Sequence, residues 1–144
     1  MNIALPAPTL LETIAVGILD IIYQMADIFT DAGEELVADY VDGTASAPSN
    51  WYVAQGTGAG TAAKGDTTLF TEASESRVAA TESQPSANQN RFVATITADG
   101  TKTVTNAGVF DASTSGNMLL KSDFTGIAVV SSDTIEFTFT ITWS

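Results

Sequence analysis

The sequence contains no cysteine and no histidine, and only five of its 144 residues are Lys or Arg. Without cysteine the chain has neither a disulfide framework nor a thiol nucleophile. Without histidine it lacks the commonest metal ligand and general base. Because 17 acidic residues outweigh the five basic ones, the net charge is −12 at pH 7. This charge disfavours nucleic acid and anionic membranes as partners, and the composition points away from catalysis.

Hydrophobic residues make up 44% of the chain, which is enough to build a core in one domain or in one domain with an appendage. The first eight residues carry no Lys or Arg, so the charged start of a secretory signal is absent. Four polar residues interrupt the apolar stretch from Leu10 to Ile28, which disfavours a membrane-spanning helix. We therefore expect a soluble protein with no membrane span.

Residues 1–43 are predicted to be helical. Thr9 and Glu12 match a capping box, and apolar residues then recur at alternating steps of four and three. A break is expected near Ala32, followed by a short second helix that ends at Asp42, before Gly43.

The apolar face of this predicted helix is wider than a helix resting on its own domain needs. One interpretation is that it simply covers the core of that domain. The other is that the surplus face packs on copies of the chain or on a partner, because such spacing suits helix–helix packing. The residues predicted for this assembly interface are Leu11, Ile14, Ile18, Ile21, Ile22, Met25, Phe29 and Leu36.

Beyond Asn50 the hydrophobic pattern changes to period two. Ile135 to Trp143 alternates apolar residues with Glu136 and three threonines, and Arg91 to Ala98 alternates similarly before an expected hairpin turn at Asp99-Gly100. Further short strands are expected at Trp51–Ala54, Arg77–Ala80, Lys102–Thr105, Val109–Phe110, Met118–Phe124 and Ile127–Val130, with one of the turns between them at Thr125-Gly126. The sequence thus predicts a mainly β protein: an antiparallel, jelly-roll-like β-sandwich over residues 50–144 with an N-terminal α-helical segment over residues 1–43.

Two motifs resemble ligand sites but lack the required context. Gly58, Gly60 and Ala63 match G-x-G-x-x-A, yet no helical pattern follows, so a loop between strands is the better interpretation. The segment from Asp111 to Gly116 resembles the opening of a calcium loop, but Ser122 stands where a bidentate Glu is needed. We therefore predict no catalytic residues, no cofactor and no metal site.

Several segments together carry a family resemblance. They are Asn50 to Gly60, Gly65 to Leu69, Glu72 to Arg77, Val104 to Asp111, Met118 to Phe124 and Asp133 to Trp143. In combination they resemble small β-rich virion proteins of tailed bacteriophages, such as the tail-collar and tail-fibre attachment family. Asn106 departs from the pattern, because the family usually has Glu there. If that Glu makes a structural hydrogen bond, an amide replaces only part of it.

The resemblance implies a non-enzymatic structural protein of the virion, assembled in the host cytoplasm. Its expected partners are itself, as a homo-oligomer with a trimer as one candidate stoichiometry, and other capsid or tail proteins. A capsid-decorating or head-fibre position is favoured because the chain ends at the domain, without a repetitive shaft. A tail-fibre or collar adaptor is the alternative. A function of another class is a carbohydrate-binding adhesin that uses Trp51 and Tyr52 as an aromatic platform.

Overall fold

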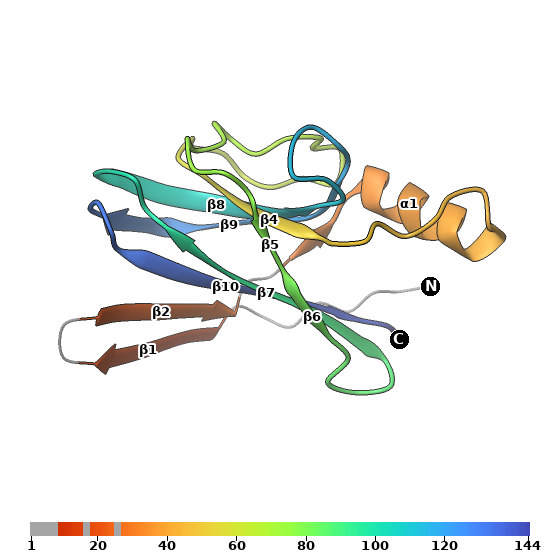
Figure 1. Cartoon of the computed structure of the whole chain (residues 1–144), viewed down its shortest axis with the longest axis horizontal. Helices are drawn as coiled ribbons and strands as arrows, with labels where there is room; N and C mark the ends of the chain where they lie inside the picture. The colour runs from red at the N-terminus through yellow and green to blue at the C-terminus, as the bar shows by residue number, and fades with distance from the viewer. Residues whose placement is uncertain (1–8, 16–17, 25–26) are drawn as a thin grey trace.

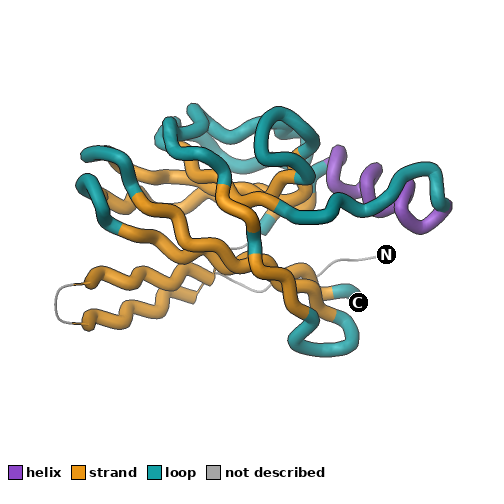
Figure 2. Tube along the Cα trace, in the orientation of Figure 1, coloured by secondary structure: helices purple, strands orange, loops and turns teal. Residues whose placement is uncertain are grey.

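The computed structural model describes residues 9–15, 18–24 and 27–144, and side chains from Asp27 onward. Two five-stranded sheets lie face to face, and one helix projects from one end of the sandwich (Figures 1 and 2). The first sheet has the order β1 (Thr9–Ala15), β2 (Ile18–Gln24), β10 (Thr134–Thr142), β7 (Gln89–Thr97) and β6 (Thr81–Ser83). The second has the order β3 (Ile28–Phe29), β9 (Met118–Val129), β8 (Lys102–Phe110), β4 (Tyr52–Gly56) and β5 (Val78–Ala79). The predicted β-sandwich is confirmed.

The period-two pattern of the closing strand positions the core. In β10 the apolar residues Ile135, Phe137, Phe139 and Ile141 are buried, and the threonines between them are partly exposed. This strand pairs antiparallel with β7 over its whole length, from Thr134↔Thr97 to Thr142↔Gln89. Burying an apolar side chain of this size contributes about 1.5–3 kcal/mol, so the alternation fixes which face of the sheet turns inward.

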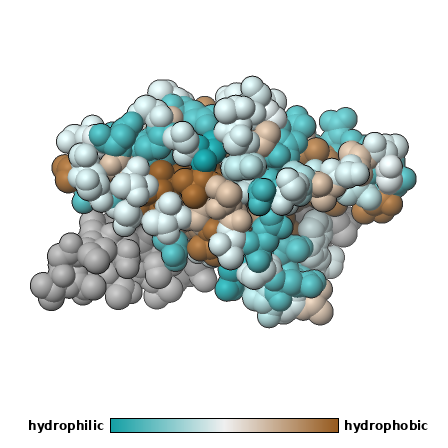
Figure 3. Space-filling model, viewed as in Figure 1, coloured by the Kyte–Doolittle hydropathy of each residue, from teal (hydrophilic) through white to brown (hydrophobic). Residues whose placement is uncertain are grey.

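The core lies between the two sheets. Phe92 and Ile96 from β7 face buried residues of the other sheet, such as Val53, Val109 and Leu120. In Figure 3 the visible outer face is mostly hydrophilic or of intermediate hydropathy, with hydrophobic patches between the two layers. This division is what a two-layer sandwich needs.

The predicted helix over the first apolar stretch is wrong. Residues 9–15 and 18–24 form an antiparallel hairpin, in register from Thr9↔Gln24 to Ala15↔Ile18. A stretch this rich in apolar residues fits a period of 2 as well as one of 3.6, and its Ile, Val and Thr residues favour strands. The free edge of β10 gives the hairpin a sheet to join. Residues 9–15, 18–24 and 28–29 are therefore strands of the sandwich, the first two in one sheet and the third in the other.

The short second helix is confirmed as α1 (Asp31–Asp42), with Gly43 in the left-handed conformation at its C-terminus. The N-cap is Thr30: its hydroxyl accepts a hydrogen bond from Gly33 N (2.9 Å) and donates one to the Met118 carbonyl. A Cβ on Gly33 would lie 2.5 Å from the Leu119 carbonyl oxygen. Glycine therefore lets the first turn of the helix lie against β9.

Two predicted turns differ in the structure. Asp99-Gly100 does not close a hairpin, because β7 and β8 lie in different sheets, so this turn carries the chain from one sheet to the other. Thr125 and Gly126 lie inside β9, which is continuous. The β8–β9 register shifts between Val104 and Asn106, near that point, and a Cβ on Gly126 would lie 2.5 Å from the Thr103 Cγ2. A turn-like dipeptide is accommodated in a strand at such an irregularity.

Asp27, just before β3, is a buried carboxylate with incomplete pairing. Its side chain is 2% exposed, and its Oδ2 accepts a hydrogen bond from Thr140 N (3.2 Å) on the edge of β10. Its Oδ1 has no partner among the described residues. Burial raises the pKa of this carboxyl well above its usual value, although the hydrogen bond from Thr140 opposes the shift. The ionised form is therefore unfavourable in the folded state.

We expect Asp27→Asn to raise the free energy of unfolding at neutral pH. The amide keeps an oxygen for Thr140 N and removes the buried charge. Because the folded-state pKa is raised, the native protein loses stability as pH rises from the unfolded pKa through the folded one. The advantage of the variant should therefore shrink on acidification. Urea unfolding at neutral and acidic pH measures this, with exposed Glu35→Gln as the control. An advantage that grows on acidification would contradict the assignment.

Candidate functional site

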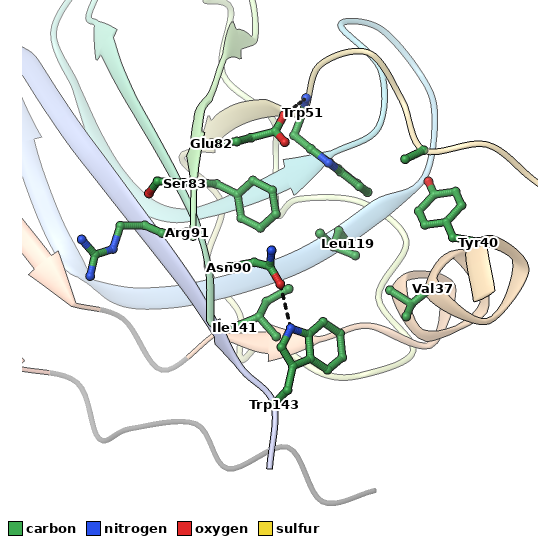
Figure 4. A pocket seen from close by; sticks show the side chains of 12 residues that line it. Val37, Tyr40, Trp51, Glu82, Ser83, Asn90, Arg91, Leu119, Ile141 and Trp143 are labelled. Atoms are coloured by element: carbon green, nitrogen blue, oxygen red, sulfur yellow. Dashed lines mark hydrogen bonds between the residues drawn. The ribbon is translucent and has the colours of Figure 1, made fainter. Parts of the chain in front are cut away.

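A pocket of about 200 Å³ opens at the end of the sandwich where α1 projects (Figure 4). It is lined from distant parts of the chain by Val37, Tyr40, Ala47, Trp51, Glu82, Ser83, Asn90, Arg91, Phe92, Leu119, Ile141 and Trp143. Figure 4 shows Trp51, Tyr40 and Trp143 on different sides of this space, coming from the start of β4, from α1 and from the chain after β10.

Aromatic rings form much of the pocket wall. Trp51 packs edge-on against Tyr40, with ring centroids 6.4 Å apart, and against Phe92 at 5.7 Å. On the other side Trp143 packs edge-on against Phe29 at 6.1 Å. Edge-on pairs of this kind hold each ring in a fixed orientation, so the wall is rigid.

Polar groups lie among these rings. Asn90 Oδ1 accepts a hydrogen bond from Trp143 Nε1 (2.7 Å), while Asn90 Nδ2 has no partner among the described residues. The carboxylate of Glu82 is held weakly, with Trp51 N at 3.4 Å from its Oε1. Burial, and next the charges of Asp111 and Asp39, raise the pKa of Tyr40, so its hydroxyl stays protonated at neutral pH. The pocket thus offers hydrogen-bond donors and a carboxylate acceptor beside aromatic surface.

Among the described side chains, Arg91 is the one Lys or Arg without an ion pair. Its buried Nε has no hydrogen-bond partner, and in Figure 4 its guanidinium points away from the pocket.

The other four basic residues are engaged in structure. Arg77 forms two hydrogen bonds to the Glu72 carboxylate, reaches the carbonyls of Ala112 and Ser115, and lies over the Phe110 ring at 3.6 Å. Lys102 pairs with Glu75 and Asp99, and Lys64 pairs with Glu34 and Asp31. These pairs tie together the loops around the second sheet.

The glycine-rich segment is packed into the domain rather than free. Gly58 N donates to the Phe70 carbonyl (2.7 Å), and Thr57 N donates to the Thr71 carbonyl (2.9 Å). A Cβ on Gly60 would lie 2.6 Å from the Phe70 ring. The glycines therefore serve a close approach of the loop to Phe70, and residues 57–71 form one folded unit that we call the clamped loop.

Asn106, on β8, holds the clamped loop in place through hydrogen bonds. Its side chain is fully buried, its Oδ1 accepts from Phe70 N (3.0 Å), and its Nδ2 donates to the carbonyls of Phe70 (3.1 Å) and Gly58 (3.3 Å). One amide thus pairs with both backbone groups of a single residue, as a neighbouring strand would.

Lys121 holds the same loop from β9. Its side chain is 0% exposed, its Nζ lies 2.8 Å from both Asp66 Oδ2 and the Thr68 carbonyl, and it lies 3.3 Å from the centre of the Phe70 ring. Burial acts to raise the pKa of Asp66, but hydrogen bonds from Lys121 and Ala63 N outweigh it and lower that pKa. The clamped loop in turn supports α1, because the Lys64 carbonyl accepts from Asp31 N (2.8 Å).

The predicted assembly residues do not lie on one helix. Leu11 and Ile14 are on β1, Ile18, Ile21 and Ile22 are on β2, and Met25 lies outside the described residues. Phe29 is buried in the core, and Leu36 packs against that core from α1. The five hairpin residues belong instead to the edge of a sheet. There β1 is the outermost strand, and among the described residues β2 joins β10 through two residue pairs, Phe137↔Tyr23 and Thr138↔Gln24.

The two aromatic residues predicted as a ligand platform are separated. Trp51 is 8% exposed and lines the pocket, whereas Tyr52 is not one of the lining residues. Sequence reasoning missed Tyr40, Asn90 and Trp143. Trp143 carried a usable signal, because it continues the inward-facing alternation of β10, whereas nothing in the sequence marked Tyr40 or Asn90.

The two motifs set aside in the sequence hold no ligand geometry. Asp111 caps its own turn, with Oδ1 accepting from Asn117 N (2.7 Å). Within residues 27–144, no group of three or more acidic side chains is placed to hold a metal ion. None of the helices in the described part of the chain has the length and hydropathy of a membrane span.

Comparison with known proteins gives one family. The model of the podophage GP4 fiber I protein gp80 family matches residues 29–142, well over half of the chain. The comparison with curated proteins gave no match. The matched range runs from the second residue of β3 through the end of β10 and includes α1, the clamped loop and every lining residue of the pocket except Trp143. By this match the chain belongs to the podophage fiber I protein family, a family of phage fibre structural proteins.

Proposed function

We propose that the protein is a non-enzymatic, oligomeric surface component of a tailed-phage virion that assembles through its β1–β2 hairpin. The observation that carries the proposal is the attachment of this hairpin. It stands at the edge of the first sheet, and two residue pairs connect it to β10. An edge strand presents unpaired backbone groups to a further strand, so the hairpin is suited to pairing with another subunit.

Charge is consistent with this role. At −12 the free subunits repel one another, which keeps them soluble before assembly. An edge strand that pairs with another subunit through backbone hydrogen bonds and apolar contacts overcomes that repulsion only where the two subunit surfaces are complementary.

For its place in the particle we keep a capsid-decorating or head-fibre position as the first hypothesis and a tail-fibre or collar adaptor as the second. The fibre family supports a virion position in both cases. Quantitative mass spectrometry of purified virions separates them. A copy number comparable to that of the major capsid protein indicates the head, and a copy number comparable to that of tail proteins indicates the tail.

Substituting hairpin residues tests the assembly role. We expect Ile18→Asp and Ile22→Asp each to abolish oligomers, because leaving an unpaired charge in an apolar interface costs about 3–5 kcal/mol. Light scattering of the full-length chain measures the mass. The matched control is Val41→Asp, which places the same charge on a residue that is 84% exposed. Unchanged mass in both hairpin variants, or an equal loss in the control, would rule out the hairpin as the interface.

Carbohydrate binding in host adhesion is the second candidate function. The pocket favours it, because aromatic rings and unpaired polar groups converge there. It does not depend on the assembly role, since the lining residues lie outside the hairpin.

A further inference from the structure

We propose that the pocket between α1 and the end of the first sheet binds a single neutral sugar ring, one unit of a glycan. The inference rests on the second candidate function and gives it a site and a ligand class. Its residues are Trp143, Trp51 and Tyr40 as apolar walls and Asn90 and Glu82 as polar contacts.

Aromatic rings form the apolar wall of the proposed sugar site. A pyranose ring has a face of C–H groups that packs on aromatic rings, while its hydroxyls point outward. The edge-on contacts of Trp51 with Tyr40 and Phe92, and of Trp143 with Phe29, fix these rings before any ligand arrives. A preformed wall saves the entropy of ordering side chains on binding.

Asn90 and Glu82 supply the polar contacts of the proposed sugar site. Asn90 is oriented by its bond to Trp143 Nε1, which leaves its Nδ2 as a donor with no partner among the described residues. Glu82 offers carboxylate oxygens, of which Oε1 accepts only a long hydrogen bond from Trp51 N, at 3.4 Å, among the described residues. Sugar hydroxyls donate and accept, so one hydroxyl serves Glu82 and another serves Asn90. A purely apolar ligand would leave both groups unpaired.

The charge and the volume of the pocket restrict the kind of sugar that it can bind. Glu82 in the lining and a net charge of −12 disfavour acidic sugars such as uronic or sialic acids. Arg91 is the one cationic side chain of the lining, and its guanidinium points away from the pocket (Figure 4). The volume of about 200 Å³ lies below the range of about 300–1,000 Å³ of pockets that enclose drug-sized ligands. One ring fits the pocket, and the rest of a glycan would extend into solvent.

The chain supplies its own reporter. It contains two tryptophans, Trp51 and Trp143, and both line this pocket. Tryptophan emission of the full-length protein should therefore change saturably on titration with neutral sugars. The probes are glucose, galactose, mannose and N-acetylglucosamine, with glucuronic acid and N-acetylneuraminic acid as the acidic comparison. We expect at least one neutral sugar to bind with a millimolar Kd and neither acidic sugar to bind as tightly.

Asn90→Asp is the sharpest variant, because it keeps the oxygen that accepts from Trp143 Nε1 and replaces the free donor with a charged acceptor oxygen. We expect the sugar Kd to rise by about fivefold or more, the loss that one hydrogen bond brings. Gln84→Glu makes the same amide-to-carboxylate change on an exposed residue outside the pocket and should leave the Kd unchanged. Tyr40→Ala, on a different element, removes one wall and should weaken binding independently. Circular dichroism checks that each variant is folded.

Three results would overturn the proposal. One is no saturable change with any of the four neutral sugars. The second is an acidic sugar that binds more tightly than all of them. The third is a Kd that stays unchanged in both folded pocket variants. Oligomer mass is measured separately, so loss of sugar binding with unchanged mass counts against this site alone, and loss of mass with unchanged binding counts against the hairpin.

Discussion

Replacing Asn106 with Ala should lower the free energy of unfolding by about 2–3 kcal/mol. The substitution leaves the backbone N–H of Phe70 without a partner, and a buried unpaired group costs about 1–3 kcal/mol. The Phe70 carbonyl loses one of its two donors and keeps Gly58 N (2.7 Å). The carbonyl of Gly58 loses a donor as well, although the hydroxyl of Thr105 still reaches it (2.5 Å). The effect should be concentrated in the clamped loop, because no other side chain pairs with the Phe70 backbone among the described residues.

Two further variants make the Asn106 measurement specific. Asn117→Ala removes an exposed amide from a turn and should cost less than about 1 kcal/mol. Asn106→Asp keeps the acceptor for Phe70 N but directs a carboxylate at the Phe70 carbonyl, so it should be nearly as damaging at neutral pH. Its burial raises the folded-state pKa of the new carboxyl, so stability should recover on acidification, when the carboxyl donates again.

Urea unfolding gives these free energies, and hydrogen exchange locates the change. The role of Asn106 as a clamp would be refuted by a loss in Asn106→Ala no larger than that in Asn117→Ala. It would be refuted equally by faster exchange spread over both sheets rather than at Phe70 and Gly58.

The sequence correctly predicted the strands in which apolar and polar residues alternate. The alternation in β10 and β7 identified their strands and their inner residues, because a one-residue slip would expose the whole apolar set. Residues 9–15 and 18–24 were mispredicted as a helix, because an apolar run rich in branched residues fits both periods. Pairing with β10, which the local sequence does not encode, decides in favour of strands.

The candidate site was predicted only in fragments. Trp51 was singled out as a ligand residue, but its neighbour Tyr52 does not line the pocket, since successive residues of an extended chain point to opposite sides. The pocket brings together Tyr40, Asn90 and Trp143 from three distant segments. Such a meeting depends on which ends of the two sheets coincide, and periodicity alone carries no information on that.

Asn106 was singled out as a departure from the resembled pattern, and the structure gives its physical role. An ionised Glu could accept a bond from Phe70 N but could not donate to the Phe70 carbonyl, whereas the amide does both. The expectation that an amide replaces only part of a Glu interaction stays a prediction. In this chain both ends of the Asn106 amide are used.

Lys121→Ala should also be strongly destabilising, by about 3 kcal/mol. The substitution leaves the Thr68 carbonyl and the Asp66 carboxylate without their cation and opens a cavity where a fully buried side chain lay. This loss of unfolding free energy lies at the lower end of the range of about 3–5 kcal/mol for a broken buried ion pair. The reason is that the side chain of Asp66 is 25% exposed, so water partly solvates it. Lys121→Met fills the same space without the charge and should cost less, so the difference between the two variants measures packing.

Acid unfolding separates the charge from the packing in Lys121. The pKa of Asp66 is lowered in the native protein, so its contribution to stability is present above the unfolded pKa and is lost as pH falls through the folded one. In Lys121→Met this acid-dependent part should be smaller than in the unsubstituted chain, while Arg77→Met, which breaks a different pair, should leave it intact. An unchanged acid dependence in Lys121→Met would show that the Asp66 pair contributes nothing to stability.

Combining Asn106→Ala with Lys121→Ala tests whether the two side chains stabilise the same loop. Both side chains contact Phe70, one through its backbone and one over its ring. Once either is lost, the clamped loop is already partly released, so the second substitution should cost less than it does alone. Because the clamped loop supports the start of α1 through the Lys64 carbonyl, and α1 carries Tyr40, the same variants should also weaken sugar binding at the pocket. Free energies that add fully, with the tryptophan titration unchanged, would show that the loop and the pocket are independent.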